Sequence, residues 1–449
     1  MKFIVKLSQL LKKSLPSPFS IAVILTYLTI ILALWLTPAA PTSQSHLLEI
    51  GSYWAKGFWE LLTFSMQMML ILVLGYVLAL TRPAKILIEK MVTYADSMPR
   101  AAIMVTFLTI LFCLINWGLG LIFGAVLARK IGESASRRKI AINYPLIGAA
   151  GYSGLMVWHG GLSGSAPLKV AESGHFLMDK IGVIPISETL FSTMNISIAL
   201  ALLVLLPLLM GWTARKTAHA NLLTRISSET AETSPENKAE IHGAERLDHS
   251  PVFSGILGIS FLATSIYLAI RAGNWSFVTL NYINFCLFTL AILLSKNIAE
   301  FLKLVQQSIG AASGILIQFP LYAGIMGIMK YSGLFLVFTD FFVRLSSAAS
   351  LPVFTLLSAG LVNFFVPSGG GQWAVQGPVI VEAAKQLGVS IPKIVMALAY
   401  GDQWTNMLQP FWALPLLGIT GLKAKEIVPY TFVLFLAGGL IFVVGLLVF

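Results

Sequence analysis

Residues 361–373 read LVNFFVPSGGGQW: an asparagine within an apolar stretch, followed by helix-breaking proline and glycine. Residues 114–120, LINWGLG, repeat this pattern in the first half of the chain. A proline follows each asparagine by 29 positions, at Pro145 and Pro392. Glycine- and proline-interrupted apolar segments at corresponding places in two halves point to the binding site of a transporter. We therefore expect the two asparagines to mark a shared site.

The composition around these motifs is that of a polytopic membrane protein. Of 449 residues, 57% are hydrophobic and 11% charged, whereas a soluble domain carries roughly 25% charged residues. Several apolar segments reach the ~20 residues that span a bilayer. The net charge of +11 fits lysine and arginine in cytoplasmic loops better than a nucleic-acid partner. Cys113 and Cys286 lie in apolar runs, so no metal site is expected.

The chain divides into two membrane halves, 1–212 and 251–449, joined by a polar linker at 213–250 that we expect to be cytoplasmic. Each half has the same order of landmarks: a glutamine, the asparagine, and a proline-started segment that glycine breaks. Gln67 precedes the first asparagine by 49 residues, and Gln318 precedes the second by 45. This order predicts an internal repeat.

The distribution of lysine and arginine predicts how the repeats lie in the membrane. If the asparagine segments 101–128 and 351–382 enter and leave on the same side, and the N-terminus is inside, 22 of the 30 basic residues are cytoplasmic. If both segments cross fully, the split is 15 to 15. The positive-inside rule favours the first arrangement. We therefore predict an all-α polytopic membrane protein with two inverted-topology repeats, each with a re-entrant hairpin and a broken transmembrane helix.

Substrate binding is expected at the hairpin tips and helix breaks. Free N–H groups at a helix N-terminus bind anions without a fixed cation, and glycine lets the backbone approach a ligand. Amide and hydroxyl side chains there would either bind the substrate or brace neighbouring helices. The candidate substrate-binding residues are Gln67, Asn116, Gly118, Ser163, Ser165, Gln318, Asn363, Ser368, Gly369, Gly370 and Asn406.

Two titratable residues at the breaks are candidates for a coupling proton or sodium ion. Asp402 follows an apolar run, and a carboxylate inside a membrane segment is expensive and usually functional. His159 is the matching candidate in the first half. The alternatives are a carboxylate that caps a broken helix and a histidine that only satisfies hydrogen bonds. Tryptophans near the breaks would wall an apolar pocket for a short acyl chain.

These residues resemble the short-chain fatty acid uptake transporter family over nearly the whole chain. The stretches that carry the resemblance are FWELL (58–62), MQM (66–68), INWG (115–118), GLSGSAPL (161–168), QFP (318–320), NF (363–364), VPSGGGQW (366–373), QGP (376–378), GDQWTNM (401–407) and QPFWALP (409–415). The resemblance implies import of acids such as acetoacetate and butyrate across a bacterial cytoplasmic membrane. The family is distantly similar in architecture to inverted-repeat carboxylate transporters, whose paired hairpins hold substrate and cation, which suggests a homodimer.

We therefore expect a secondary active transporter of short monocarboxylates, with no cofactor beyond a coupling H⁺ or Na⁺. One alternative is a carrier of another small organic anion, such as a dicarboxylate. An intramembrane enzyme is the alternative of another class, but no His-Glu-x-x-His motif and no paired cysteines occur. A channel or scaffold is a further alternative. The sequence has no Gly-rich phosphate loop ending in Lys-Ser/Thr, so primary transport by this chain alone is not expected.

Overall fold

The computed structural model describes residues 16–39, 45–138, 140, 142–217, 243–273, 277, 280–367 and 369–449. Within these ranges all regular structure is helical, which confirms the predicted fold class. Six described helices are long and apolar enough to cross a membrane: α2 (Pro18–Leu36), α6 (Met98–Ile115), α11 (Thr193–Thr217), α13 (Pro251–Ala272), α16 (Ser313–Tyr331) and α22 (Ala424–Val448). A seventh span results if α3 (His46–Gly57) and α4 (Leu62–Leu80), which meet at a 43° bend, count as one. The chain is therefore a multi-pass membrane protein.

The first asparagine segment is a helical hairpin. Helix α6 ends at Ile115, Asn116 is extended, and α7 (Trp117–Arg137) runs back beside α6. The arms touch through glycine: a Cβ atom on Gly124 would lie 2.6 Å from Oγ1 of Thr109. A side chain there would push the arms apart, so glycine is what lets them pack closely.

The second asparagine segment is also a helical hairpin, formed by α18 (Leu351–Asn363) and α19 (Gly369–Leu387). Its arms are joined by the side chain of Gln372, whose Nε2 donates to the carbonyl of Ala359 at 2.8 Å. With 13 residues, α18 is about 20 Å long. That is shorter than the roughly 30 Å hydrocarbon core, so this arm cannot cross the bilayer alone. The orientation of the two halves in the membrane stays a prediction.

The two proline-started segments are broken helices, as their sequences predicted. The first runs through α8 (Tyr144–Tyr152), two short 3-10 turns and α9 (Ser165–Ala171). The second consists of α20 (Ile391–Thr405) and α21 (Pro410–Thr420). Tyr152 joins them, because its hydroxyl donates to the carbonyl of Asn406 at 2.8 Å. The breaks of the two halves therefore meet inside the protein.

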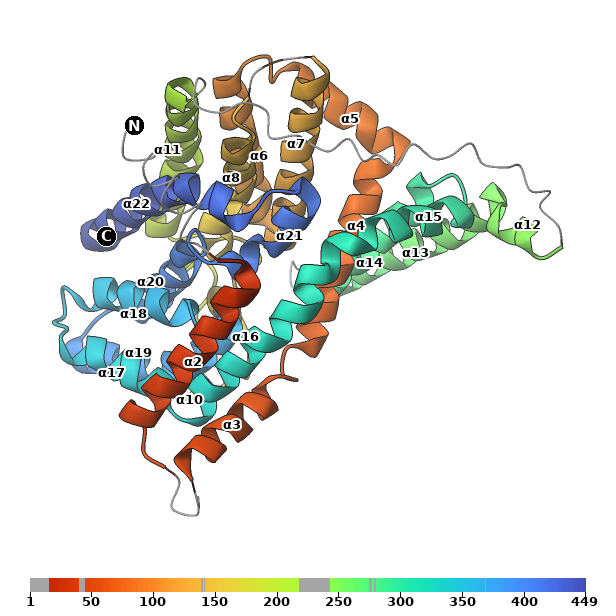
Figure 1. Ribbon diagram of the computed structural model, residues 1–449. Coiled ribbons are helices and arrows are strands. Elements are labelled where there is room, and N and C mark those ends of the chain that lie inside the picture. The colour runs from red at the N-terminus through yellow and green to blue at the C-terminus, as the bar shows by residue number, and fades with distance from the viewer. Residues whose placement is uncertain are drawn as a thin grey trace.

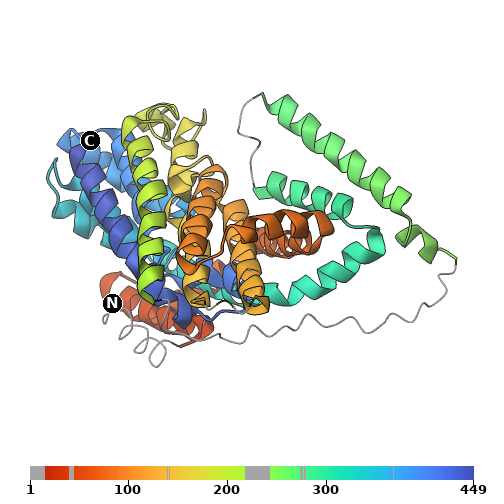
Figure 2. The same cartoon turned by 90° about the horizontal axis from the view of Figure 1, so that it is seen from above.

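The remaining helices surround this junction or project from it. Figure 1 shows α6, α7, α11 and α22 in the body, whereas α13, α14 (Leu280–Leu294) and α15 (Ile298–Ile309) form an arm packed on α4. Figure 2 shows the same arm from above, projecting to one side of the body. Among the described helices, four amphipathic ones were not among the apolar segments of the sequence: α3, α5 (Arg82–Thr93), α15 and α17 (Leu334–Arg344). The short helices α10 and α12 span Met178–Ile181 and Glu245–Asp248. Of the predicted linker, 218–242 lies outside the described residues.

Candidate functional site

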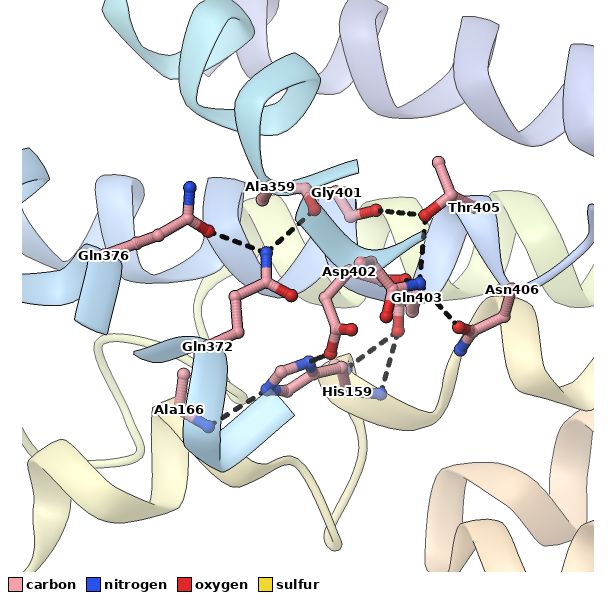
Figure 3. Close-up of polar contacts among 12 residues, drawn as sticks. His159, Ala166, Ala359, Gln372, Gln376, Gly401, Asp402, Gln403, Thr405 and Asn406 are labelled. Atoms are coloured by element: carbon pink, nitrogen blue, oxygen red, sulfur yellow. Dashed lines mark hydrogen bonds and ion pairs between the residues drawn. The ribbon is translucent and has the colours of Figure 1, made fainter. Parts of the chain in front are cut away.

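A buried histidine–aspartate pair joins the two halves at their breaks. Nδ1 of His159 lies 2.6 Å from Oδ2 of Asp402, and the two side chains are 0% and 1% exposed. His159 comes from the 3-10 turn that interrupts the first broken segment, and Asp402 from the last turn of α20. Figure 3 shows the ring and the carboxylate facing each other. The structure thus brings together the two residues that the sequence singled out as candidates for ion coupling.

The hydrogen bonds of His159 indicate the role of each ring nitrogen. The backbone N–H of Ala166 donates to Nε2 at 3.0 Å, so this nitrogen carries a lone pair. The proton of the neutral ring is then on Nδ1 and is donated to the carboxylate. Oδ2 of Asp402 is the acceptor in this contact, and a carboxylate at a buried position is unfavourable unless it is compensated.

The N-terminus of α19 lies against this charged pair. A Cβ atom on Gly369 would come within 2.8 Å of Oδ2 of Asp402 and 2.6 Å of Cε1 of His159. Only glycine fits at this contact without displacing the pair. The partial positive charge at the start of a helix favours a nearby carboxylate, so α19 offsets part of the cost of burying Asp402.

Asn363 and Asn406 hold the second hairpin against the same break. Nδ2 of Asn363 donates to the carbonyl of Asp402 at 2.8 Å, to Oγ1 of Thr405 at 3.0 Å and to Oδ1 of Asn406 at 2.8 Å. Gln409 returns a bond from its Nε2 to the carbonyl of Asn363 at 2.7 Å. The end of α18 is thereby fixed to the end of α20.

The first hairpin contacts its own break in a different way. Oδ1 of Asn116 accepts from the backbone N–H groups of Gly118 at 2.9 Å and Leu119 at 3.1 Å, which caps α7. Oγ of Ser163 accepts from the N–H of Trp117 at 3.0 Å. Asn116, Gly118 and Ser163 therefore have the bracing geometry that the sequence left open as an alternative to substrate binding.

Gly370 and Ser165 border an open position next to the pair. A Cβ atom on Gly370 would meet only Cβ of Ser165, at 3.8 Å, and Gly370 is exposed. Ser165 is half-buried at the start of α9. The candidate Ser368 lies outside the described residues.

The two candidate glutamines lie elsewhere. Nε2 of Gln67 donates to Oδ1 of Asn281 on α14 at 2.7 Å, in the arm. Gln318 lines a cavity of about 640 Å³ beside the starts of α2, α16 and α22, together with Lys423. The repeated order of glutamine and asparagine along the chain therefore does not bring these glutamines to the His159–Asp402 pair.

Several polar residues that contact the broken segments beside His159 and Asp402 were not predicted from the sequence. Oε1 of Gln403 accepts from the N–H of His159 at 2.8 Å and of Gly160 at 3.3 Å. Nδ2 of Asn195 donates to the carbonyl of Gly160 at 2.8 Å, and its Oδ1 accepts from Tyr400 at 2.9 Å. Gln372 is described above. The only available signal was an amide in an apolar segment, which is also the signal of ordinary helix–helix contacts.

Aromatic rings cover the pair on the side of the first hairpin. The ring of Trp158 stacks on His159 with centroids 4.4 Å apart. Trp117 and Trp412 meet edge to face at 5.0 Å, and both lie within reach of Trp158, at 6.0 and 6.3 Å. Trp404 instead stacks on Phe435. Three of the tryptophans near the breaks thus form one apolar wall.

The sequence profile and the curated relatives that match this chain indicate the same family. The sequence profile described as "Short chain fatty acid transporter" matches residues 2–449. A protein of Escherichia coli (strain K12) named "Putative short-chain fatty acid transporter" is 39% identical over 447 residues, covering 99% of this chain and 98% of that protein. A protein of the same name from Haemophilus influenzae is 35% identical, covering 97% and 96%.

Two solved structures are more distantly similar. The YdaH transporter of Alcanivorax borkumensis is 16% identical, with a TM-score of 0.46, and the match covers 96% of this chain and 97% of that one. MtrF of Neisseria gonorrhoeae, whose structure is reported as illuminating a class of antimetabolite efflux pumps, is 16% identical, with a TM-score of 0.41 and coverage of 98% and 97%.

Proposed function

The chain belongs to the short chain fatty acid transporter family, and we propose that it imports short monocarboxylates such as acetoacetate and butyrate across the bacterial cytoplasmic membrane. The family is one of transporters and not of enzymes. The observation that carries the proposal is the His159–Asp402 contact, which joins the interrupted segments of both halves at a buried position. Irregular backbone within a membrane protein is tolerated where it lines a ligand site or is buried in protein.

The substrate carboxylate would bind between the start of α19 and the first break. The partial positive charge at the start of α19 favours an anion, and the open position between Gly370 and Ser165 gives it access. The wall formed by Trp117, Trp158 and Trp412 would hold the short acyl chain. This division into a polar end and an apolar end suits a small monocarboxylate.

The charges around the pair favour one carboxylate over two. Among the described residues, the groups bonded to the His159 and Asp402 side chains are each other and a backbone amide. Neither lysine nor arginine is among these partners. A second carboxylate of a dicarboxylate would then have no cation to pair with, and burying it would be unfavourable.

Transport would be driven by a cation that enters with the substrate. Asp402 supplies the carboxyl group of the pair, and His159 orients it through the 2.6 Å contact. A proton or a sodium ion at this carboxylate would neutralise the site before the halves rearrange. We further propose that two copies of the chain associate in the membrane. Light scattering of the detergent-solubilised protein would give the mass of the particle and hence the number of copies.

Proteoliposome uptake tests the substrate assignment. Purified protein should take up labelled butyrate and acetoacetate with saturation and show counterflow, and unlabelled butyrate should compete better than succinate. A channel would show neither saturation nor counterflow. Saturable uptake of succinate but not of butyrate would contradict the proposal and favour the dicarboxylate alternative.

Two glycine substitutions test the position of the carboxylate. In Gly370→Ala the new methyl group meets only Ser165, so the protein should fold. If the carboxylate binds there, the methyl group competes with it, and we expect the half-saturating butyrate concentration to rise about tenfold, which corresponds to about 1.4 kcal/mol. Gly255→Ala is the matched control, because its Cβ atom on α13 has nothing within 4 Å. Equal uptake kinetics in both variants would remove Gly370 from the site.

A further inference from the structure

The cavity of about 640 Å³ lies where helices α2, α16 and α22 begin. Ser17 lines it at the start of α2, Ser313 at the start of α16 and Ala424 at the start of α22. Its volume is in the range of about 300–1,000 Å³ that is usual for ligand sites. Neither His159 nor Asp402 is among the described residues that line it. The proposed transport site therefore does not account for this cavity.

The three helices also place the cavity in the membrane. Each of them is long and apolar enough to cross a bilayer, so their starts mark one level near the membrane surface. From there the cavity reaches inward to Gln318, which follows the start of α16 by five residues, or about 8 Å at the rise of an α-helix. The cavity therefore extends from the level of the lipid headgroups to the edge of the hydrocarbon core.

The charged residues that line the cavity are lysines. Lys423 precedes α22 and Lys425 lies in its first turn, and the described lining residues include no aspartate or glutamate. The carboxylate of Glu426 caps α22, where it accepts from the N–H of Lys423 at 2.8 Å. Residues 1–15, which precede the lining residue Pro16 in the sequence, contain four lysines and no acidic residue. Basic residues next to the start of a membrane helix attract anionic lipid.

Much of the remaining lining is apolar or small. Leu414 and Leu417 of α21 contribute side chains, and a Cβ atom on the lining residue Gly310 would have nothing within 4 Å, so there is open space beside it. Only 17% of the apolar stretch of α2 is buried inside the protein, which leaves the flank of this helix to acyl chains. A free inorganic anion would use the lysines and leave the leucines in contact with water, which is unfavourable. A ligand with an anionic end and an apolar end uses both.

We propose that this cavity binds an anionic phospholipid. The phosphate of the headgroup would lie at Lys423 and Lys425, and the upper part of the acyl chains would lie against Leu414 and Leu417. Basic pockets between membrane helices bind lipid headgroups in this way. The lipid would hold the starts of α2, α16 and α22 against α21. The proposal does not rest on the proposed transport function, because none of its residues was assigned to the substrate or the coupling ion there.

Lipid titration of the full-length protein in detergent tests the proposal. Thermal unfolding is followed by tryptophan fluorescence while phosphatidylglycerol, phosphatidylcholine with the same acyl chains, or glycerol 3-phosphate is added at constant ionic strength. A ligand that binds only the folded protein raises the unfolding temperature as its concentration increases. We expect a saturable rise with phosphatidylglycerol, at a concentration about tenfold below that needed of phosphatidylcholine, and no rise with glycerol 3-phosphate.

Two results of this titration would overturn the proposal. Equal responses to the two lipids, or no response to either, would mean that the cavity does not select an anionic lipid. A response to glycerol 3-phosphate as large as that to phosphatidylglycerol would mean that the ligand is a free anion and not a lipid.

Charge variants assign the response to the cavity. The double variant Lys423→Gln/Lys425→Gln should raise the phosphatidylglycerol concentration for half the shift at least about tenfold, because each lysine near the membrane surface adds to the affinity for anionic lipid. The control Lys90→Gln/Lys296→Gln removes the same charge from two exposed lysines outside the cavity and should keep the wild-type value. Equal effects of the two double variants would show a general attraction of charge and would contradict the site.

A glycine substitution fills the cavity without changing its charge. Gly310 has helical backbone angles, with φ −58° and ψ −30°, and open space for a side chain, so Gly310→Leu should fold and unfold at the wild-type temperature without lipid. The leucine would occupy space proposed for the lipid, and we expect the phosphatidylglycerol response to weaken at least about tenfold. Gly255→Leu on α13 is the matched control, because its Cβ atom also has nothing within 4 Å. A wild-type lipid response of Gly310→Leu would contradict the site.

A measurement on the wild-type protein decides the question if a variant does not fold. The protein is incubated with an equimolar mixture of phosphatidylglycerol and phosphatidylcholine, and native mass spectrometry identifies the lipid that stays bound. Preferential retention of phosphatidylglycerol supports the proposal, and equal retention of the two lipids would overturn it.

Discussion

The tips of the two hairpins carry the same residue and use it in opposite ways. At the first tip, the oxygen of Asn116 accepts from two N–H groups at the start of α7. At the second tip, the nitrogen of Asn363 donates to three oxygens around the end of α20. The oxygen of Asn363 accepts no hydrogen bond among the described residues. At the first tip the side-chain oxygen of the asparagine is fully used in capping α7, whereas at the second tip the side-chain oxygen can still accept a hydrogen bond.

The difference follows from which helix end each asparagine serves. Asn116 precedes a helix, where backbone N–H groups lack partners and need an acceptor. Asn363 ends a helix and faces the end of another, where carbonyl groups lack partners and need a donor. A repeated motif thus caps a helix in one half and joins two helix ends in the other. The predictions below test this difference between the two tips.

The largest effect is expected from removing the carboxylate of Asp402 on α20, which the second tip contacts through Asn363. In Asp402→Asn the pair with His159 loses its carboxylate, and breaking a buried pair costs about 3–5 kcal/mol, or more than about a hundredfold in an equilibrium constant. We expect stability to fall by this amount, and butyrate uptake at equal amounts of folded protein to be largely lost. The control Asp340→Asn removes a carboxylate from α17, outside the cluster, and should transport normally. Wild-type uptake by a folded Asp402→Asn protein would show that transport does not depend on this carboxylate.

The same substitution at both asparagines tests the contrast directly. Asp keeps an acceptor and loses the donor, so Asn116→Asp should still cap α7 and keep uptake within about twofold, because aspartate and asparagine cap helices about equally well. Asn363→Asp replaces three donor bonds by oxygen–oxygen repulsion, and we expect at least about a tenfold loss of uptake, since unpartnered buried groups cost about 1–3 kcal/mol each. The measurement is the initial rate of butyrate uptake at matched protein amounts. Equal losses in both variants would mean that the tips are equivalent after all.

A smaller effect is expected from weakening the brace at the first tip. Ser163→Ala removes the acceptor for the N–H of Trp117, a bond of 3.0 Å. We expect a loss of about 1 kcal/mol of stability, seen as a lower unfolding temperature with little change in the half-saturating butyrate concentration. A large rise in that concentration without a change in unfolding would instead make Ser163 a substrate ligand.

The smallest effect is expected at Gln67. Its amide bonds to Asn281 in the arm and not to the junction. We expect Gln67→Ala to leave butyrate uptake unchanged and stability within about 0.5 kcal/mol, as for most substitutions away from buried networks. A clear loss of uptake would connect the arm to transport and would show that the junction is not the whole site.

The sequence predicted the hairpins and broken segments because glycine and proline interrupt apolar runs at fixed places. It also singled out His159 and Asp402, since ionisable groups are rare in membrane segments. It could not predict that they touch, because they are 243 residues apart and only the packing of the halves brings them together. Gln372 and Gln403 escaped notice because an amide in an apolar helix looks the same whether it binds a ligand or a neighbour. The repeated order of landmarks made Gln67 and Gln318 candidates for the same site, whereas the structure has them in other contacts.

The pairing of His159 with Asp402 also has a consequence for biogenesis. A contact over 243 residues forms only after most of the chain has been synthesised, and contacts that are remote in sequence are slow to form during folding. Until α20 arrives, His159 has no carboxylate to bond. We therefore expect chains that end before α20 to lack the junction on which the proposed transport depends.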